Sequence, residues 1–149
     1  MKNLDLYKDH YLLSTDRNKL DIELIHEFLC NESGWSNGIP YETVKKSIHN
    51  SLNFGLYDEE KQIGYARVIS DFSTIAYLGD IFILKKYRGL GLSKWLMEII
   101  MGHEELQNLR RWILLTSTAE WLYEKYGFVN LPKPEIYMEK FNPNVYHKI

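Results

Sequence analysis

The chain has 149 residues, enough for one domain and too few for a second large one, so we expect a single domain over residues 1–149. A formal net charge of −2 lacks the basic excess typical of proteins whose main partner is nucleic acid. The single cysteine, Cys30, cannot form an internal disulfide, and no apolar run approaches a membrane span in length. The first ten residues lack the apolar core of a signal peptide. We therefore expect a cytoplasmic protein without a membrane partner.

The first half of the chain alternates strand-like and helix-like patterns. Apolar residues recur at helical spacing over 22–29, and Pro40 suits the first turn of a second helix that continues to residue 48. Between these helices, Gly34 and Gly38 mark a loop. The patterns predict strands over 11–13, 54–57 and 62–69, and the last two form a hairpin around a polar turn.

The second half contains the segment most informative for function. Residues 77–84 are mostly apolar on both faces, which is typical of a strand buried within a sheet. A glycine turn, a long amphipathic helix from Leu92 and a strand over 112–115 follow, and this order predicts a parallel strand–helix–strand crossover. A short helix over 119–126 ends at Gly127, and a closing strand is expected over 136–141. The fold class is therefore a mixed α/β fold with a mostly antiparallel central sheet, one parallel crossover and about four helices.

The glycine turn at residues 88–94 joins the buried strand to the start of a helix. Free N–H groups and the positive end of the helix dipole attract phosphate at such a position, and basic side chains surround this turn. The spacing excludes a dinucleotide fingerprint, which needs glycine where Lys94 stands, and a P-loop, which needs Gly-Lys-Ser/Thr. On the glycines alone, a tight structural turn with solvated lysines and arginines explains the segment equally well.

Two motifs together resemble the GCN5-related N-acetyltransferase (GNAT) family. Arg88, Gly91 and Ser93 occupy the positions of its acetyl-CoA signature, with serine in place of the usual final glycine or alanine. Residues 119–128 (Ala-Glu-Trp-Leu-Tyr-Glu-Lys-Tyr-Gly-Phe) resemble its second signature. The motifs occur in the family's order, separated by one helix and one strand, and the order of elements agrees over nearly the whole chain.

The resemblance implies acetyl-CoA as the acyl donor, without a metal ion. The backbone of the strand before the turn would pair with the pantetheine arm, the turn would hold the pyrophosphate, and Thr116 stands where many members carry an asparagine that helps hold the cofactor. The cofactor-binding residues expected in this way are Ile81, Phe82, Ile83, Arg88, Gly89, Leu90, Gly91, Leu92, Ser93, Lys94, Thr116, Ala119 and Tyr123.

The same resemblance implies a chemical role for Tyr123, which matches the tyrosine that protonates the coenzyme A thiolate. Asp80 lies within an apolar run, on the face expected to carry Leu78 and Phe82, and a carboxylate there needs a reason because its desolvation is costly. Two interpretations stay equally open. Asp80 either accepts the proton of the amine, as an acidic residue does in some relatives, or forms an ion pair with Arg67.

Acceptor binding in this fold commonly involves the first two helices, their loop and the opposite part of the sheet. The expected substrate-binding residues are Trp35, Tyr65, Arg67, Asp71 and Phe72, with Tyr41 also near. The five histidines have no metal-ligand spacing. Cys30 lies at the end of an apolar helical face, where a lone cysteine is usually a small core residue, so we expect direct transfer without an acyl-enzyme.

The sequence therefore predicts an N-acetyltransferase that moves the acetyl group of acetyl-CoA onto a primary amine, which we expect to belong to a small molecule. Alternatives are a non-catalytic acyl-CoA-binding regulatory module, a nucleotide-binding regulatory domain, and an enzyme that acetylates a protein lysine or N-terminus. The sequence is compatible with a monomer and with a homodimer.

Overall fold

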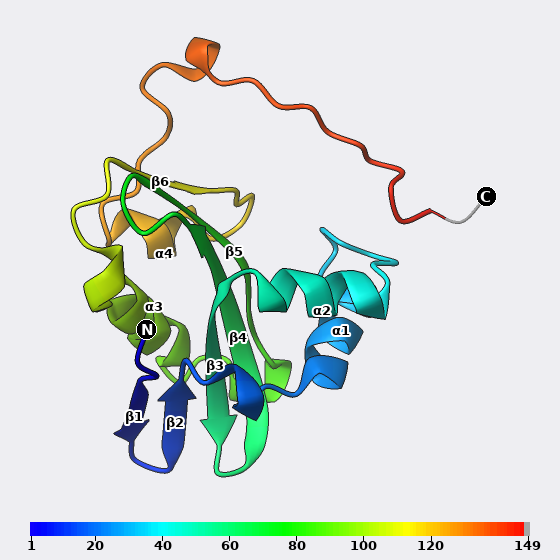
Figure 1. Ribbon diagram of the computed structural model, residues 1–149, viewed down its shortest axis with the longest axis vertical. Helices are drawn as coiled ribbons and strands as arrows, with labels where there is room; N and C mark the ends of the chain where they lie inside the picture. Colours follow the sequence, from blue (N-terminus) through cyan, green and yellow to red (C-terminus); the bar gives the residue numbers. More distant parts are fainter. Residues whose placement is uncertain (148–149) are drawn as a thin grey trace.

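The computed structural model describes residues 1–147 and contains one six-stranded sheet with helices on both faces (Figure 1). The strands are β1 (Asp5–Lys8), β2 (Tyr11–Ser14), β3 (Leu52–Asp58), β4 (Lys61–Ser70), β5 (Ile75–Ile83) and β6 (Arg111–Leu114). The α-helices are α1 (Ile22–Asn31), α2 (Tyr41–His49), α3 (Leu92–Gly102) and α4 (Glu120–Glu124). No helix within residues 1–147 is long and apolar enough to cross a membrane.

The strands lie in the sheet in sequence order, β1 to β6. Every neighbouring pair is antiparallel except β5 and β6, which are parallel and connected through α3. This topology confirms the predicted fold class, including the crossover and the number of helices. The sequence missed β1, a four-residue edge strand that begins and ends with a charged residue and is mostly exposed, so it has no apolar alternation to reveal it.

Two apolar clusters hold the helices against the sheet. On one face lies the larger cluster, here called the α3-side cluster. It includes Trp95, Leu96 and Ile100 of α3 and Leu122 of α4. On the other face lies a smaller cluster, here called the α1-side cluster. It includes Ile25 and Phe28 of α1, Val44 and Ile48 of α2, and Tyr65 and Phe82 of the sheet. Figure 1 shows these two helix pairs on opposite sides of the strands. The ends of the central strands, where the candidate site lies, are therefore held from both sides.

A β-bulge in β5 changes which face each later residue occupies. Tyr65 pairs with Phe82 but Arg67 pairs with Gly79, so β5 carries one extra residue over this stretch. Asp80 lies there with φ 52°, in the left-handed region. Leu78 therefore packs in the α3-side cluster, whereas Phe82 packs in the α1-side cluster. The prediction that Asp80 shares one face with both residues is wrong, because strict alternation does not continue through a bulge.

The closing strand predicted over 136–141 is also absent. Pro134–Ile136 forms a short 3₁₀ helix, and the chain after it has no assigned strand up to residue 147. Pro132 and Pro134 fix φ and remove two backbone donors just where the chain would have to turn back beside β6. The C-terminal arm, defined as residues 129–147, instead leaves the body beyond α4 and runs toward the loop between α1 and α2 (Figure 1). There Tyr146 lies against Gly38.

Candidate active site

The glycine turn has the backbone that its sequence requires. Gly89 and Gly91 have φ of 79° and 78°, in the left-handed region where residues with a Cβ are strained. Gly91 is the N-cap of α3 and provides no side chain to bond the N–H groups of the first turn. Arg88 donates from Nε to the carbonyl of Ile83 at 2.9 Å, which fixes the turn to the end of β5. The turn therefore presents N–H donors beside exposed Arg88 and Lys94.

A substitution at Gly91 separates the dihedral requirement from crowding. No atom lies within 4 Å of a Cβ built at Gly91, so Gly91→Ala creates strain through its φ alone. We expect a loss of about 1–2 kcal/mol in the free energy of unfolding, measured by urea denaturation. Gly102→Ala is the matched control, since Gly102 also has open space around it but no positive φ. The control should be neutral or stabilising, and equal losses for the two variants would contradict this explanation.

Next to the turn, β5 has an edge without a strand neighbour. Its pairing with β6 ends at Leu78 opposite Leu114, although β5 continues to Ile83. On its other side, β5 is paired with β4 as far as Ile83, and Leu84 donates to Ile63. Backbone groups of an extended strand point alternately to its two sides, so those of Ile81 and Ile83 face the open edge. The side chain of Phe82 stacks on Phe28, with 4.0 Å between the ring centroids, and belongs to the core.

Tyr123 lies on α4 at the carboxyl end of β6. It is 9% exposed, packs in the α3-side cluster and meets the ring of Phe128 edge-on. It lines a pocket of about 260 Å³ together with Thr116 and Leu114. Within residues 1–147 its hydroxyl makes no hydrogen bond, and burial raises the pKa of Tyr123 above the ordinary value of 10.0. The side chain is therefore a neutral phenol with an uncommitted proton at neutral pH.

Thr116 and Ala119 are connected to each other. The N–H of Ala119 donates to Oγ1 of Thr116 at 3.1 Å, one residue before α4 begins. Thr116 therefore helps to fix the start of the helix that carries Tyr123. Its hydroxyl proton stays available to a ligand, because the oxygen acts as the acceptor in this bond.

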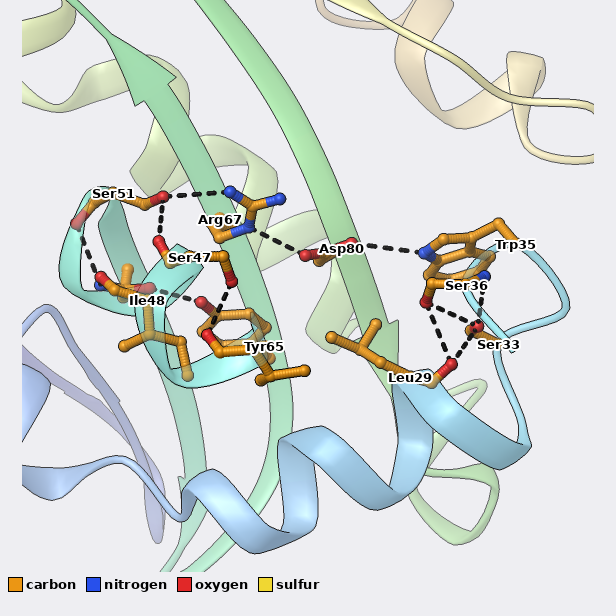
Figure 2. Close-up of polar contacts among 12 residues, drawn as sticks. Leu29, Ser33, Trp35, Ser36, Ser47, Ile48, Ser51, Tyr65, Arg67 and Asp80 are labelled. Carbon is orange, nitrogen blue, oxygen red and sulfur yellow. Dashed lines mark hydrogen bonds and ion pairs between the residues drawn. The ribbon is translucent and has the colours of Figure 1, made fainter. Parts of the chain in front are cut away.

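Asp80, Arg67 and Trp35 form one polar group at the bulge (Figure 2). Arg67 donates from Nε to Oδ2 of Asp80 at 2.8 Å, and the indole N–H of Trp35 donates to Oδ1 at 3.3 Å. The Arg67 and Asp80 side chains are each 16% exposed, whereas Trp35 is 56% exposed. The ion pair considered from the sequence is therefore present. Each carboxylate oxygen keeps a further acceptor position for a substrate N–H or a water.

Ser51, which contacts α2, helps to hold Arg67 in place. The Arg67 Nη1 donates to Oγ of Ser51 at 3.1 Å, and Ser51 in turn donates to the carbonyl of Ser47 on α2 (Figure 2). These contacts connect the bulge to the end of a helix on the α1–α2 face. No sequence signal indicated Ser51, because a serine before a strand is an ordinary loop residue.

Three predicted acceptor residues do not join this group. Tyr65 is fully buried and its hydroxyl bonds Asn53, so the prediction that it contacts substrate does not fit its position in the core. Asp71 accepts from the N–H groups of Ser73, Thr74 and Ile75 and from the Thr74 hydroxyl, which places it in a turn between β4 and β5. These bonds hold the pKa of Asp71 well below its usual value. Phe72 lies in the same turn with φ 60°. Short turn-forming functions explain Asp71 better than ligand binding does.

A mixed sheet that separates between its parallel strands, beside a glycine turn at a helix start, is the arrangement of an acetyltransferase domain. Residues 49–130 match the acetyltransferase (GNAT) domain. The chain is 34% identical to the uncharacterized N-acetyltransferase ycf52 of Pyropia yezoensis over 137 residues, covering 85% of this chain and 74% of that protein. The chain therefore belongs to the GNAT family of acetyltransferases.

Solved structures agree with this assignment. A GNAT-family protein from Xanthomonas campestris superimposes with a TM-score of 0.91 at 44% identity and covers 95% of this chain and 100% of its own. A predicted acetyltransferase from Clostridium acetobutylicum, solved with acetyl-CoA, has a TM-score of 0.67 at 16% identity, covering 93% and 98% of the two chains. The second likeness is one of fold alone.

Proposed function

We propose that this protein transfers the acetyl group of acetyl-CoA directly onto a primary amine of a small molecule. The observation that carries the proposal is the open edge of β5 from Gly79 to Ile83, which runs into a turn with two left-handed glycines at the start of α3. An unpaired strand edge suits an amide-containing chain, and free N–H groups at a helix start suit its pyrophosphate. One ligand that carries both is coenzyme A.

The turn residues then divide into backbone and side-chain contributors. The N–H groups of Leu92, Ser93 and Lys94 open α3 and would bond phosphate oxygens, while Arg88 and Lys94 supply positive charge. Ile81 and Ile83 contribute main-chain groups at the open edge, so their side chains matter less than their backbone.

The chemistry needs no covalent intermediate with the protein. The nitrogen of the neutral amine forms a bond to the acetyl carbon, the carbon–sulfur bond breaks, and the sulfur takes the electron pair. Tyr123 donates its phenolic proton to that sulfur, since the hydroxyl is neutral and makes no other bond in residues 1–147. Asp80 accepts the proton that the amine loses, directly or through a water, while Arg67 and Trp35 hold the carboxylate.

A small acceptor suits the shape of the Asp80 environment. Only 16% of the carboxylate side chain is exposed, and it lies between a guanidinium and an indole. Because so little of the carboxylate is exposed, we infer that a small amine reaches it more easily than a lysine on a bulky protein surface does. Acetylation of lysine peptides by the purified protein, with no activity on small amines, would overturn this choice of acceptor.

Calorimetric titration with acetyl-CoA tests the donor. We expect one-to-one binding, and a ligand that binds only the folded state raises stability by about 2.7 kcal/mol at a hundredfold excess over Kd. Charge reversal at Arg88 and Lys94 should abolish binding, whereas reversal of exposed Lys45 and Lys46 on α2 makes the same change in net charge and should not. No detectable binding at millimolar acetyl-CoA, or displacement of coenzyme A by ATP, would contradict the proposal. Binding without turnover on any amine would favour a non-catalytic module.

A further inference from the structure

Tyr77 of β5 lies on the same face of the sheet as Arg67. The residue that follows it, Leu78, pairs with Val68 of β4, and both pack in the α3-side cluster. Side chains alternate along a strand, so Tyr77 and Gly79 lie on the opposite face, where Gly79 pairs with Arg67. Tyr77 is half-buried, which leaves part of its side chain open to a ligand.

The ring of Tyr77 lies across Gly79, the residue directly before Asp80. A Cβ at Gly79 would lie 2.8 Å from Cε1 of Tyr77, closer than real Cβ atoms come to another heavy atom. A glycine in a strand interior often marks such a close approach. Because Gly79 has no side chain, the ring can extend from residue 77 along the strand toward the bulge at Asp80.

The hydroxyl of Tyr77 is neutral and uncommitted. Burial raises the pKa of Tyr77 above its ordinary value of 10.0, the charge of Asp80 raises this pKa further, and the charge of Arg67 lowers it. Both charged groups therefore lie within electrostatic reach of the phenol. Within residues 1–147 the hydroxyl makes no hydrogen bond, so its oxygen is free to accept one and its proton is free to be donated.

A primary amine that reaches Asp80 carries one N–H group more than the transfer consumes. The nitrogen lone pair attacks the acetyl carbon, one N–H gives its proton to Asp80, and the other stays on the nitrogen of the amide product. In a half-buried site that second N–H needs an acceptor, because an unsatisfied polar group is costly. Arg67 and Trp35, which flank the carboxylate, have only donors to offer. The oxygen of Tyr77 is an acceptor beside them.

We propose that Tyr77 determines the specificity of the acceptor site, with its phenolic oxygen accepting the second N–H of a primary amine. This inference rests on the proposed function. A secondary amine has a single N–H, which Asp80 takes, and its extra alkyl group would meet the phenolic oxygen instead. The phenol would then lose a hydrogen bond without gaining another, so the site selects primary over secondary amines.

Turnover of matched amine pairs tests this selection. The probes are benzylamine, butylamine and ethanolamine, each compared with its N-methyl derivative. We expect the wild type to have the higher kcat/KM on each primary amine, and Tyr77→Phe to lower the primary-to-secondary ratio roughly tenfold, the effect of one hydrogen bond. Phenylalanine keeps the ring across Gly79, so selection by the size of the pocket alone would survive this change.

Tyr57→Phe is the matched control. Tyr57 of β3 also lies across a glycine of its own strand, Gly55, and its buried hydroxyl has no hydrogen-bond partner within residues 1–147. The charged groups that act on its phenol are aspartates other than Asp80. We therefore expect Tyr57→Phe to keep the wild-type ratio of primary to secondary turnover.

The possible results separate the role of Tyr77 from the proposed function. No turnover of any of the primary amines by the wild type would contradict the proposed function and overturn the inference with it. An active wild type whose ratio is unchanged in Tyr77→Phe, or falls equally in Tyr57→Phe, would overturn the role of Tyr77 alone.

Gly79→Ala tests the placement of the ring. The added Cβ displaces the ring of Tyr77 but leaves its hydroxyl intact, so we expect the ratio to fall as it does in Tyr77→Phe. The double variant should show no further fall, because both changes remove the same contact. Independent falls that multiply in the double variant would mean that Gly79 does not position Tyr77, and would overturn this placement.

Discussion

Tyr123→Phe is expected to lower kcat by about 100-fold or more while leaving the affinity for acetyl-CoA unchanged, because a positioned general acid contributes about 10²–10⁴ to a rate. Phenylalanine keeps the ring that packs in the α3-side cluster and against Phe128. The hydroxyl has no hydrogen-bond partner within residues 1–147, so its removal should change the free energy of unfolding by less than about 0.5 kcal/mol. Steady-state kinetics with a reporter of free coenzyme A thiol measures the rate.

Tyr126→Phe is the control for that experiment. The Tyr126 hydroxyl donates to the carbonyl of Lys94 at 3.0 Å, just after α4, so its loss should cost about 1 kcal/mol of stability with little change in kcat. Tyr123→Phe should therefore lower kcat with little change in stability, whereas Tyr126→Phe should lower stability with little change in kcat. Unchanged turnover in Tyr123→Phe would remove Tyr123 as the proton donor.

The pH dependence of the wild-type enzyme follows from the burial of Tyr123. Burial raises the pKa of Tyr123 above 10.0, so the hydroxyl keeps its proton throughout the neutral range. It stops acting as a general acid only when the pH rises above 10 and the proton dissociates. We therefore expect no alkaline decrease in kcat below pH 10 that depends on Tyr123. If such a decrease exists and disappears in Tyr123→Phe, the hydroxyl ionises more easily than its burial indicates.

Asp80→Asn is expected to lower kcat by roughly 100-fold, because it removes the group proposed to accept the proton of the amine. Asparagine is the appropriate substitution at φ 52°, since it tolerates the left-handed region almost as well as aspartate does, whereas alanine would add backbone strain. The lost ion pair with Arg67 should also cost stability, by about 1.5–3 kcal/mol. KM for acetyl-CoA should stay unchanged.

Arg67→Gln separates the two roles considered for Asp80. It breaks the same ion pair by removing the guanidinium. The Asp80 carboxylate stays in place and still accepts a hydrogen bond from the Trp35 indole. If Asp80 is the base, Arg67→Gln should keep activity within about tenfold of wild type while Asp80→Asn loses far more. Equal loss of rate in the two variants, in proportion to their loss of stability, would mean that Asp80 serves only the ion pair.

The sequence by itself determined the elements whose signals are local. Hydrophobic periodicity predicted α1, α2 and α3, and the polar turn before Lys61 predicted the β3–β4 hairpin. The glycines at 89, 91 and 127 all have the positive φ that their place in a turn or cap requires. The two GNAT motifs predicted the family, because a strand-to-helix turn and a short helix are each contained within about ten residues.

Only the tertiary structure decided the features that depend on contacts between distant segments. The bulge at Asp80 exists because β5 pairs with β4 in a shifted register, which no periodicity reveals, and it turns Asp80 toward Arg67 and Trp35. Tyr65 and Asp71 were both predicted to bind substrate. Tyr65 instead lies in the core, and Asp71 forms a turn. The strand-like sequence of 136–141 forms no strand within residues 1–147, because Pro134 begins a short 3₁₀ helix that takes up its first residue, Ile136. Local propensity is a property of a segment, whereas pairing and burial belong to the partner that the fold provides.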